Sequence, residues 1–169
     1  GCGKTIIAFI AMFFAVINGG QGALMAPTEI LARQHYIQFV EFFGEENVVF
    51  LAGSLTSAEH KAALEKIKSG KAKYIVGTNA LIQKSVEYNN LLLIVTDEQH
   101  RFGVAQRARF FNKGNSPHTL VMSATPIPRT LSLIVFGDLD ISVIDELPKG
   151  RQTVSTSVIS KKREVDMLK

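Results

Sequence analysis

Short apolar runs alternate with longer helical patterns through most of this chain, and no other feature of the sequence constrains its fold as much. The run LLLIVTDE at 91–98 is the strongest strand signal, because branched apolar residues follow one another without interruption. Further strands are expected at 23–27, 48–52, 73–78 and 119–125. Continuous apolar runs are typical of strands buried on both faces, and strands separated by helices favour a parallel sheet. We therefore predict an α/β fold, with a mostly parallel sheet and helices on both faces.

Helical patterns fill the intervals between these strands, at 6–17, 28–43, 57–68 and 104–112. The first of them, IIAFIAMFFAVI, is apolar throughout but shorter than the roughly 20 residues that a bilayer requires. It also lacks the basic start and the cleavage site of a signal peptide. We expect a helix that is buried on most sides and ends at Gly19-Gly20, and we expect no membrane partner.

The composition is that of an ordinary globular protein with room for one sizeable domain, since 46% of its 169 residues are hydrophobic. Lys and Arg exceed Asp and Glu by 19 − 15 = 4, which permits an anionic partner without requiring one. Cys2 is the single cysteine, so no disulfide can form within the chain. A reducing, cytoplasmic setting is therefore expected.

The composition shifts near ELPKGR at 146–151, where Pro148 and Gly150 are typical of a linker. One alternating strand and a charged helix start follow this stretch. We expect residues 1–146 to form one domain, and 147–169 to be a linker and the first elements of another.

The chain opens with GCGKT, which matches the second half of the phosphate-binding loop G-x-x-x-x-G-K-[ST]. Gly3 would let backbone amides turn toward phosphates, and a helix starting near Lys4 would direct its positive dipole end at them. Lys4 would reach the outer phosphates, and the Thr5 hydroxyl would hold Mg²⁺. Such a short motif also occurs as a plain glycine turn, but the long apolar helix behind it favours the phosphate site.

Two acids, Asp97 and Glu98, end the strongest predicted strand. In open parallel sheets, ligands bind at this end of the strands. Asp97 could hold Mg²⁺, usually through water, and Glu98 could polarise the water that attacks the terminal phosphate. Alone, the two acids could simply lead the strand into a loop. Paired with GKT, they form a two-part ATPase signal.

Small polar residues mark three further strand ends, in SATPIPRT at 123–130, APTE at 26–29 and VGTNAL at 76–81. The first could bond the acids of the neighbouring strand, or could simply be a strand stopped by its prolines. In the other two, Thr28 and Thr78 could cap helices or could bind backbone phosphates of a nucleic acid.

The remaining polar features carry less information. His35, His60 and His118 have no metal-ligand partners at a useful spacing, so structural or solvent roles are expected. NKGN at 112–115 approaches the guanine-reading motif of GTPases but lacks its aspartate, which counts against a GTPase. A small P-loop kinase would need an acceptor pocket and lid arginines, and the sequence indicates neither.

Taken in order, GKT, APTE, VGT, DEQH and SAT resemble motifs I, Ia, Ib, II and III of the superfamily 2 helicases. Longer stretches resemble the first motor domain of the bacterial branched-DNA helicases, most specifically DEQHRFG and ATPIPRTL. The resemblance covers essentially the whole chain. The related transcription-repair coupling translocases usually read DEEH, so Gln99 and the GDLD stretch at 137–140 favour the branched-DNA helicases.

The resemblance implies a RecA-like P-loop NTPase domain of an ATP-driven DNA translocase that remodels stalled replication forks and Holliday junctions in repair and recombination. It implies ATP and Mg²⁺ as cofactors and branched or forked DNA as partner. For ATP and hydrolysis, the motif positions are Gly1, Gly3, Lys4, Thr5, Asp97 and Glu98, with Thr5 and Asp97 on Mg²⁺. For coupling they are Gln99, His100, Ser123, Ala124 and Thr125, and for DNA binding Pro27, Thr28, Gly77 and Thr78.

Several parts of these helicases have no counterpart here: the start of the phosphate loop, a wedge domain that reads the fork, and a second motor domain whose arginines complete the ATP site. We therefore expect a fragment whose isolated form hydrolyses little ATP. Two alternatives stay open, the transcription-repair coupling translocase and a DNA-binding module whose ATPase is dead.

Overall fold

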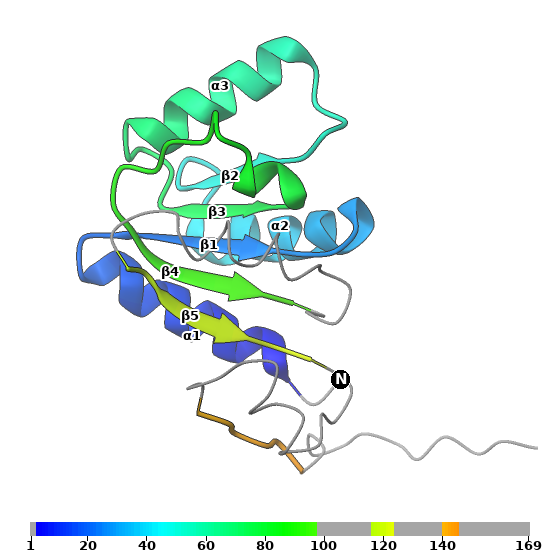
Figure 1. Ribbon diagram of the computed structural model, residues 1–169, viewed down its shortest axis with the longest axis vertical. Helices are drawn as coiled ribbons and strands as arrows, with labels where there is room; N and C mark the ends of the chain where they lie inside the picture. Colours follow the sequence, from blue (N-terminus) through cyan, green and yellow to red (C-terminus); the bar gives the residue numbers. More distant parts are fainter. Residues whose placement is uncertain (1–2, 98–115, 124–139, 146–169) are drawn as a thin grey trace, which may run out of the picture.

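The computed structural model describes residues 3–97, 116–123 and 140–145, and Figure 1 shows how their helices and strands are arranged. The elements are α1 (Lys4–Ile17), β1 (Gln21–Met25), α2 (Glu29–Phe43), β2 (Val48–Leu51), α3 (Ser57–Lys68), β3 (Tyr74–Gly77), the 3₁₀ helix η1 (Asn79–Ile82), β4 (Leu91–Thr96) and β5 (His118–Val121). The helix expected at 104–112 and the segment 147–169 lie outside the described residues.

The five strands form one sheet in the order β2-β3-β1-β4-β5, and every neighbouring pair is parallel. Leu24 of the central strand β1 pairs with Val76 of β3 on one side and with Val95 of β4 on the other. Because all pairs are parallel, the carboxyl ends of the strands lie along one edge of the sheet (Figure 1). The predicted parallel α/β fold is confirmed.

Helices cover both faces of the sheet. On one face, α1 and α2 bury residues such as Phe9 and Phe39, whose ring centroids lie 4.2 Å apart, against alternate strand residues such as Leu24. On the other face, α3 and η1 pack on the intervening strand residues, with Ile67 and Leu81 fully buried. Strand residues are thus buried on both sides, which explains why their sequences are continuously apolar.

One expectation about α1 is wrong. The helix was expected to be buried on most sides, yet only Ala8, Phe9 and Met12 are buried. The exposed fractions of its large apolar side chains lie between 43% and 58% for Ile6, Ile7, Ile10, Phe13, Phe14 and Ile17. The reason is geometric, because a helix lying on a sheet presents a single face to it. In the part of the chain that the structure describes, no helix has the length and apolar character that spanning a bilayer takes.

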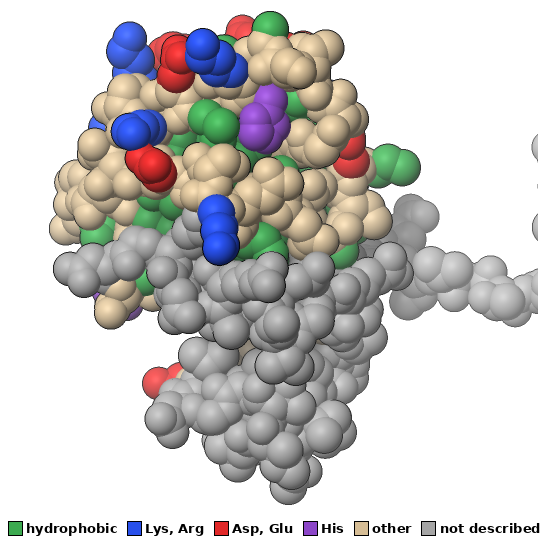
Figure 2. All heavy atoms as spheres, turned by 45° about the horizontal axis from the view of Figure 1, so that its top comes forward, with side chains coloured by type: hydrophobic (Ala, Val, Ile, Leu, Met, Phe, Trp, Pro, Cys, Tyr) green, Lys and Arg blue, Asp and Glu red, His purple; other side chains and the backbone are tan. Residues whose placement is uncertain are grey.

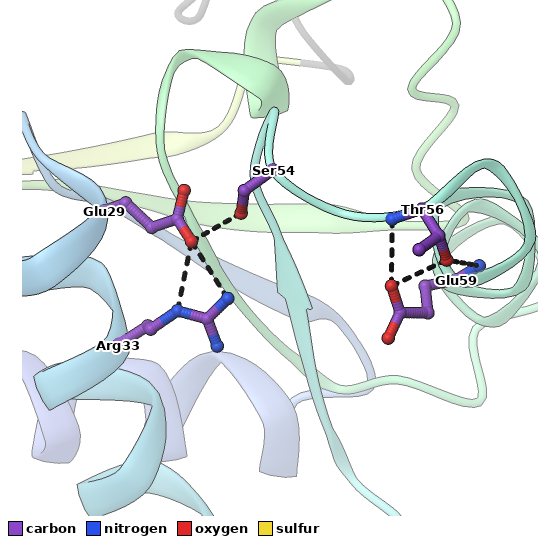
Figure 3. Close-up of polar contacts among 5 residues, drawn as sticks. All are labelled: Glu29, Arg33, Ser54, Thr56 and Glu59. Atoms are coloured by element: carbon purple, nitrogen blue, oxygen red, sulfur yellow. Dashed lines mark hydrogen bonds and ion pairs between the residues drawn. The ribbon is translucent and has the colours of Figure 1, made fainter.

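The helix ends follow local sequence signals. Thr28 caps α2 by accepting a hydrogen bond from Leu31 N, and Thr56 caps α3 in a reciprocal capping box with Glu59 (Figure 3). After α1, Gly19 has a φ of 83°, a left-handed conformation that favours glycine. Gly70, with a φ of 72°, has the same conformation shortly after α3, which therefore begins and ends where the sequence predicts.

Gln21 holds the amino edge of the sheet together. Its side chain is almost fully buried, with 1% of the residue exposed. Gln21 Nε2 donates to the carbonyl oxygens of Ile67 (2.9 Å) and Ala72 (2.7 Å). Gln21 Oε1 accepts from the backbone N–H groups of Asn89 (2.8 Å) and Asn90 (3.2 Å). One side chain therefore satisfies four backbone groups from segments distant in sequence.

Candidate functional site

The described candidate residues gather along the carboxyl edge of the sheet. Asp97 directly follows β4, and Ser123 lies shortly after the neighbouring strand β5. The backbone N–H of Asp97 donates to Met25 O at the end of β1 (3.0 Å), and Met122 N donates to Thr96 O (2.9 Å). These bonds extend the sheet past the strand ends, so the peptide group between Thr96 and Asp97 is held by both neighbouring strands.

The amino end of α1 reaches the same edge. α1 packs on β1 and β4, and it runs back against the strand direction, so its first turn lies where the strands end (Figure 1). Gly3 precedes the helix with φ 84° and ψ 14°, a left-handed conformation that costs an ordinary L residue free energy. Lys4 and Thr5 form the first turn, which contains no acidic residue. The arrangement suits an anion, because first-turn amides and the helix dipole both favour negative charge.

A histidine that sequence reasoning assigned only a structural or solvent role lies beside Asp97. His35 Nε2 is 2.9 Å from Asp97 Oδ2, and both side chains are largely buried, with 9% and 14% exposed. The two residues are 62 positions apart in the chain. The sequence of α2 could have pointed to His35, because its buried residues are Ala32, His35 and Phe39, which lie on one face of the helix. A histidine within a core-facing stripe requires a polar partner.

Two buried polar atoms at this edge have no hydrogen-bond partner among the described residues, His35 Nδ1 and Thr96 Oγ1. Thr96 immediately precedes Asp97 and is fully buried. Burying a polar atom without a partner costs stability, so such atoms are rare in folded proteins. Their concentration around Asp97 distinguishes this edge from the rest of the described core.

The APTE junction is tied to the next loop by an exposed polar network (Figure 3). Glu29 accepts hydrogen bonds from the Ser54 hydroxyl and from Arg33 Nε (3.0 Å) and Nη2 (2.9 Å). The bond from Ser54, and then those from Arg33, lower the pKa of the Glu29 carboxyl below its ordinary value. The guanidinium of Arg33 also lies 4.7 Å from the ring centroid of Phe50 on β2. The network connects the start of α2 to the loop that follows β2.

The candidate DNA-binding residues differ in exposure. Thr28 is exposed, Pro27 and Thr78 are half-buried, and Gly77 is buried. A Cβ on Gly77 would clash with the carbonyl oxygen of Leu51, so glycine is required for the close approach of β3 to β2. Thr78 stands at the start of η1, and its side chain makes no capping hydrogen bond there. Thr28 and Thr78 follow neighbouring strands, which places both junctions side by side.

The charges are mixed on the face of the molecule drawn in Figure 2, which is turned toward α3. Figure 2 shows Lys, Arg, Asp and Glu side chains interspersed over the described surface, without a broad area of one sign. The net charge of +4 is therefore not gathered there into a basic patch.

The remaining candidates lie outside the described residues. They are Gly1, Glu98, Gln99, His100, Ala124 and Thr125. The described donors fit magnesium, since Mg²⁺ is usually bound by one or two carboxylates together with substrate phosphates. Asp97 supplies a carboxylate and Thr5 a hydroxyl, and one hydrogen bond from His35 does not exhaust the acceptor sites of a carboxylate.

Comparison with known proteins identifies relatives of this chain. The family model described as DEAD/DEAH box helicase matches residues 1–134. The chain is 53% identical over 156 residues to the ATP-dependent DNA helicase RecG of Streptococcus pneumoniae, covering 92% of this chain and 23% of that protein. It is 52% identical over 171 residues to the RecG of Aquifex aeolicus, covering 98% of this chain and 22% of that protein. The chain thus spans less than a quarter of the length of these relatives.

Solved structures agree with the sequence matches. The structure of RecG bound to a three-way DNA junction has a TM-score of 0.79 and 43% identity, over 99% of this chain and 22% of that one. The helicase domain of Hef from Pyrococcus furiosus has a TM-score of 0.63 and 26% identity, over 79% of this chain and 30% of that one. The parallel sheet and its helices are therefore those of helicase motor domains.

Proposed function

Because this chain belongs to the DEAD/DEAH box helicase family, we propose that it is part of the first motor domain of an ATP-dependent DNA helicase of the RecG type. The observation that carries the proposal is the meeting of two features at one sheet edge. These are the glycine-led amino end of α1, which suits phosphates, and Asp97, which suits a metal ion. The high identity to RecG proteins over nearly the whole chain supports the particular type of helicase.

In this proposal, Gly1, Gly3 and Lys4 bind the phosphates of ATP. The ammonium of Lys4 offsets the charge of the outer phosphates, and Thr5 and Asp97 hold Mg²⁺. When bound, the ion would neutralise charge that develops on the phosphate oxygens. Glu98 orients and polarises the attacking water.

The same proposal assigns DNA to the neighbouring junctions. Pro27, Thr28, Gly77 and Thr78 would lie against backbone phosphates of one strand. The segments Gln99–His100 and Ser123–Thr125 would couple ATP turnover to movement along DNA. By analogy with the relative bound to a three-way junction, the substrate would be branched DNA, such as a stalled replication fork or a Holliday junction, in the nucleoid of a bacterial cytoplasm.

The proposed division of the chain follows the composition. Residues 1–146 would belong to the first motor domain, and 147–169 would lead into a second one. The second motor domain would supply arginines to the ATP site, and a wedge domain would read the fork. An arginine of this kind can be worth about 10³–10⁵ in rate, so the 169-residue chain alone should show little DNA-stimulated turnover.

The test is ATP turnover by the full-length protein, with and without forked DNA. Lys4→Ala should lower turnover by at least about 10²-fold, because the phosphates lose their main counter-charge. Lys61→Ala, on the exposed surface of α3, is the matched control and should behave as wild type. Glu98→Gln should bind ATP yet fail to hydrolyse it. Normal turnover by Lys4→Ala would contradict the role assigned to Lys4, and a wild-type protein that hydrolyses no ATP would favour a DNA-binding module whose ATPase is dead.

A further inference from the structure

The pair formed by His35 and Asp97 carries an inference that deepens the proposed function and rests on it. We propose that His35 is a positioning residue, whose imidazole fixes the Asp97 carboxylate in the orientation that receives the Mg²⁺–nucleotide complex. His35 itself would touch neither the nucleotide nor the ion. Its role would be exerted through Asp97 Oδ2, 2.9 Å from His35 Nε2.

The chemistry of the two groups defines the bond. An ionised carboxylate only accepts hydrogen bonds, so His35 Nε2 carries the proton and donates it. On the other side of the ring, Nδ1 is buried and has no hydrogen-bond partner among the described residues. A charge-assisted bond between two largely buried groups is stronger and shorter than one between neutral groups.

Stability does not explain why a histidine stands here. The stripe of Ala32, His35 and Phe39 faces the core, where an apolar side chain would pack without leaving a buried nitrogen unpaired. Replacing both members of a buried polar pair by apolar residues is often neutral or stabilising, so folding alone requires neither His35 nor Asp97. The arrangement is understandable if the orientation of Asp97 matters more than the free energy of folding, as is common among residues that support metal ligands.

The elements around the pair are rigid enough for this role. The backbone of Asp97 is fixed by its bond to Met25 O, but that bond leaves the rotation of its side chain undetermined. α2 is anchored by the Thr28 cap at its start and by the fully buried Phe39 one turn after His35. His35 thus approaches Asp97 from a second, independently held element, which is how precise sites are supported.

Helix α2 also connects the proposed DNA-binding junction with the proposed ATP site. Thr28, a candidate DNA contact, caps α2, and His35 follows about two helical turns later. A displacement of the start of α2 would therefore move the group that orients Asp97.

The experiment measures the affinity of the full-length protein for a fluorescent, non-hydrolysable ATP analogue, once with Mg²⁺ and once with EDTA. His35→Leu removes the donor and should weaken binding with Mg²⁺ by about 10-fold, as losses of outer-shell partners do, while binding in EDTA stays unchanged. His35→Gln places an amide N–H near the position of Nε2 and should restore the magnesium-dependent affinity. His60→Leu, the same change on α3, is the matched control.

A further pair of variants keeps the test decisive if the leucine variant does not fold. The amide of His35→Asn is too short to reach Asp97, so this variant should lose the magnesium-dependent affinity that His35→Gln keeps. Equal losses with Mg²⁺ and with EDTA would show a merely structural role and would overturn the inference, as would equal behaviour of the asparagine and glutamine variants. If the wild-type protein gained no affinity from Mg²⁺, the proposed function itself would fail. A gain that His35→Leu leaves intact would contradict only the role of His35.

Discussion

The two edges of the sheet differ in whether their buried polar groups are hydrogen-bonded. At the amino edge, Gln21 is buried with its amide fully engaged by four backbone groups. At the carboxyl edge, the His35–Asp97 pair and Thr96 leave two buried polar atoms without partners among the described residues. A satisfied buried network stabilises and specifies a fold, whereas an unsatisfied one costs free energy. The comparison assigns a stabilising role to the amino edge and supports the ligand site proposed at the carboxyl edge.

The largest effect is expected at the amino edge. Gln21→Met keeps the length of the side chain but leaves the Ala72 carbonyl oxygen and two N–H groups without their partner, while Ile67 O keeps its bond from Gly70 N. Each buried group without a partner costs about 1–3 kcal/mol, so the free energy of unfolding should fall by about 3–5 kcal/mol after partial relaxation. Urea denaturation followed by circular dichroism measures the loss.

The control for Gln21→Met is Gln38→Met, the same change at an exposed position of α2. The folded fraction of the Gln21→Met protein should bind the ATP analogue as wild type does, since the opposite edge is untouched. A Gln21→Met protein with the stability of wild type would contradict the role of the amino edge. A folded Gln21→Met protein that fails to bind nucleotide would show that the two edges are not independent.

Much of this fold follows from local sequence signals, and the long-range pairings do not. The alternation of apolar runs predicts the parallel sheet, and the helical pattern at 57–68 predicts α3. A helix capped by Thr78 was one interpretation of VGTNAL, and the structure has a single 3₁₀ turn there, η1, without a capping hydrogen bond from the Thr78 side chain. The exposure of α1 was missed because a helix that is apolar on all sides does not reveal which side faces the sheet.

The candidate site likewise contains residues that the sequence predicts and residues that it does not. Motif spacing predicts Lys4, Asp97 and Ser123, since parallel strands bring their carboxyl ends to one edge regardless of packing details. The partner of Asp97 could not be predicted, because the position of His35 depends on how α2 lies across the sheet. The same holds for Gln21, whose four partners come from segments that only the folded chain brings together.

A smaller effect of opposite sign is expected at the carboxyl edge. Thr96→Val replaces a buried hydroxyl that lacks a partner among the described residues by a methyl group of similar size. Removing an unsatisfied polar atom should raise the free energy of unfolding by about 1 kcal/mol or leave it unchanged. Thr119→Val on the neighbouring strand, half-buried, is the control for the general effect of this change. A clear loss of stability in Thr96→Val alone would show that the hydroxyl is satisfied and would weaken the contrast between the edges.

The smallest effect is expected from the exposed network of Glu29, Ser54 and Arg33, which lies at the carboxyl edge but in contact with solvent (Figure 3). The hydrogen bond from Ser54, followed by those from Arg33, lowers the pKa of Glu29 in the folded protein. The ionised carboxylate therefore stabilises the folded state above the ordinary pKa of the group, and this contribution is lost as the pH falls from that value through the lowered pKa.

Glu29→Gln keeps an acceptor oxygen without the charge, so the urea midpoints of wild type and variant should differ slightly near neutral pH and converge in acid. Exposed ion pairs contribute little, and added salt should reduce the difference further. Glu41→Gln on the same helix controls for the removal of one surface charge. A difference that persisted in acid would mean that Glu29 acts through packing. The exposed Glu29 network would then not differ in this respect from the buried His35–Asp97 pair at the same edge.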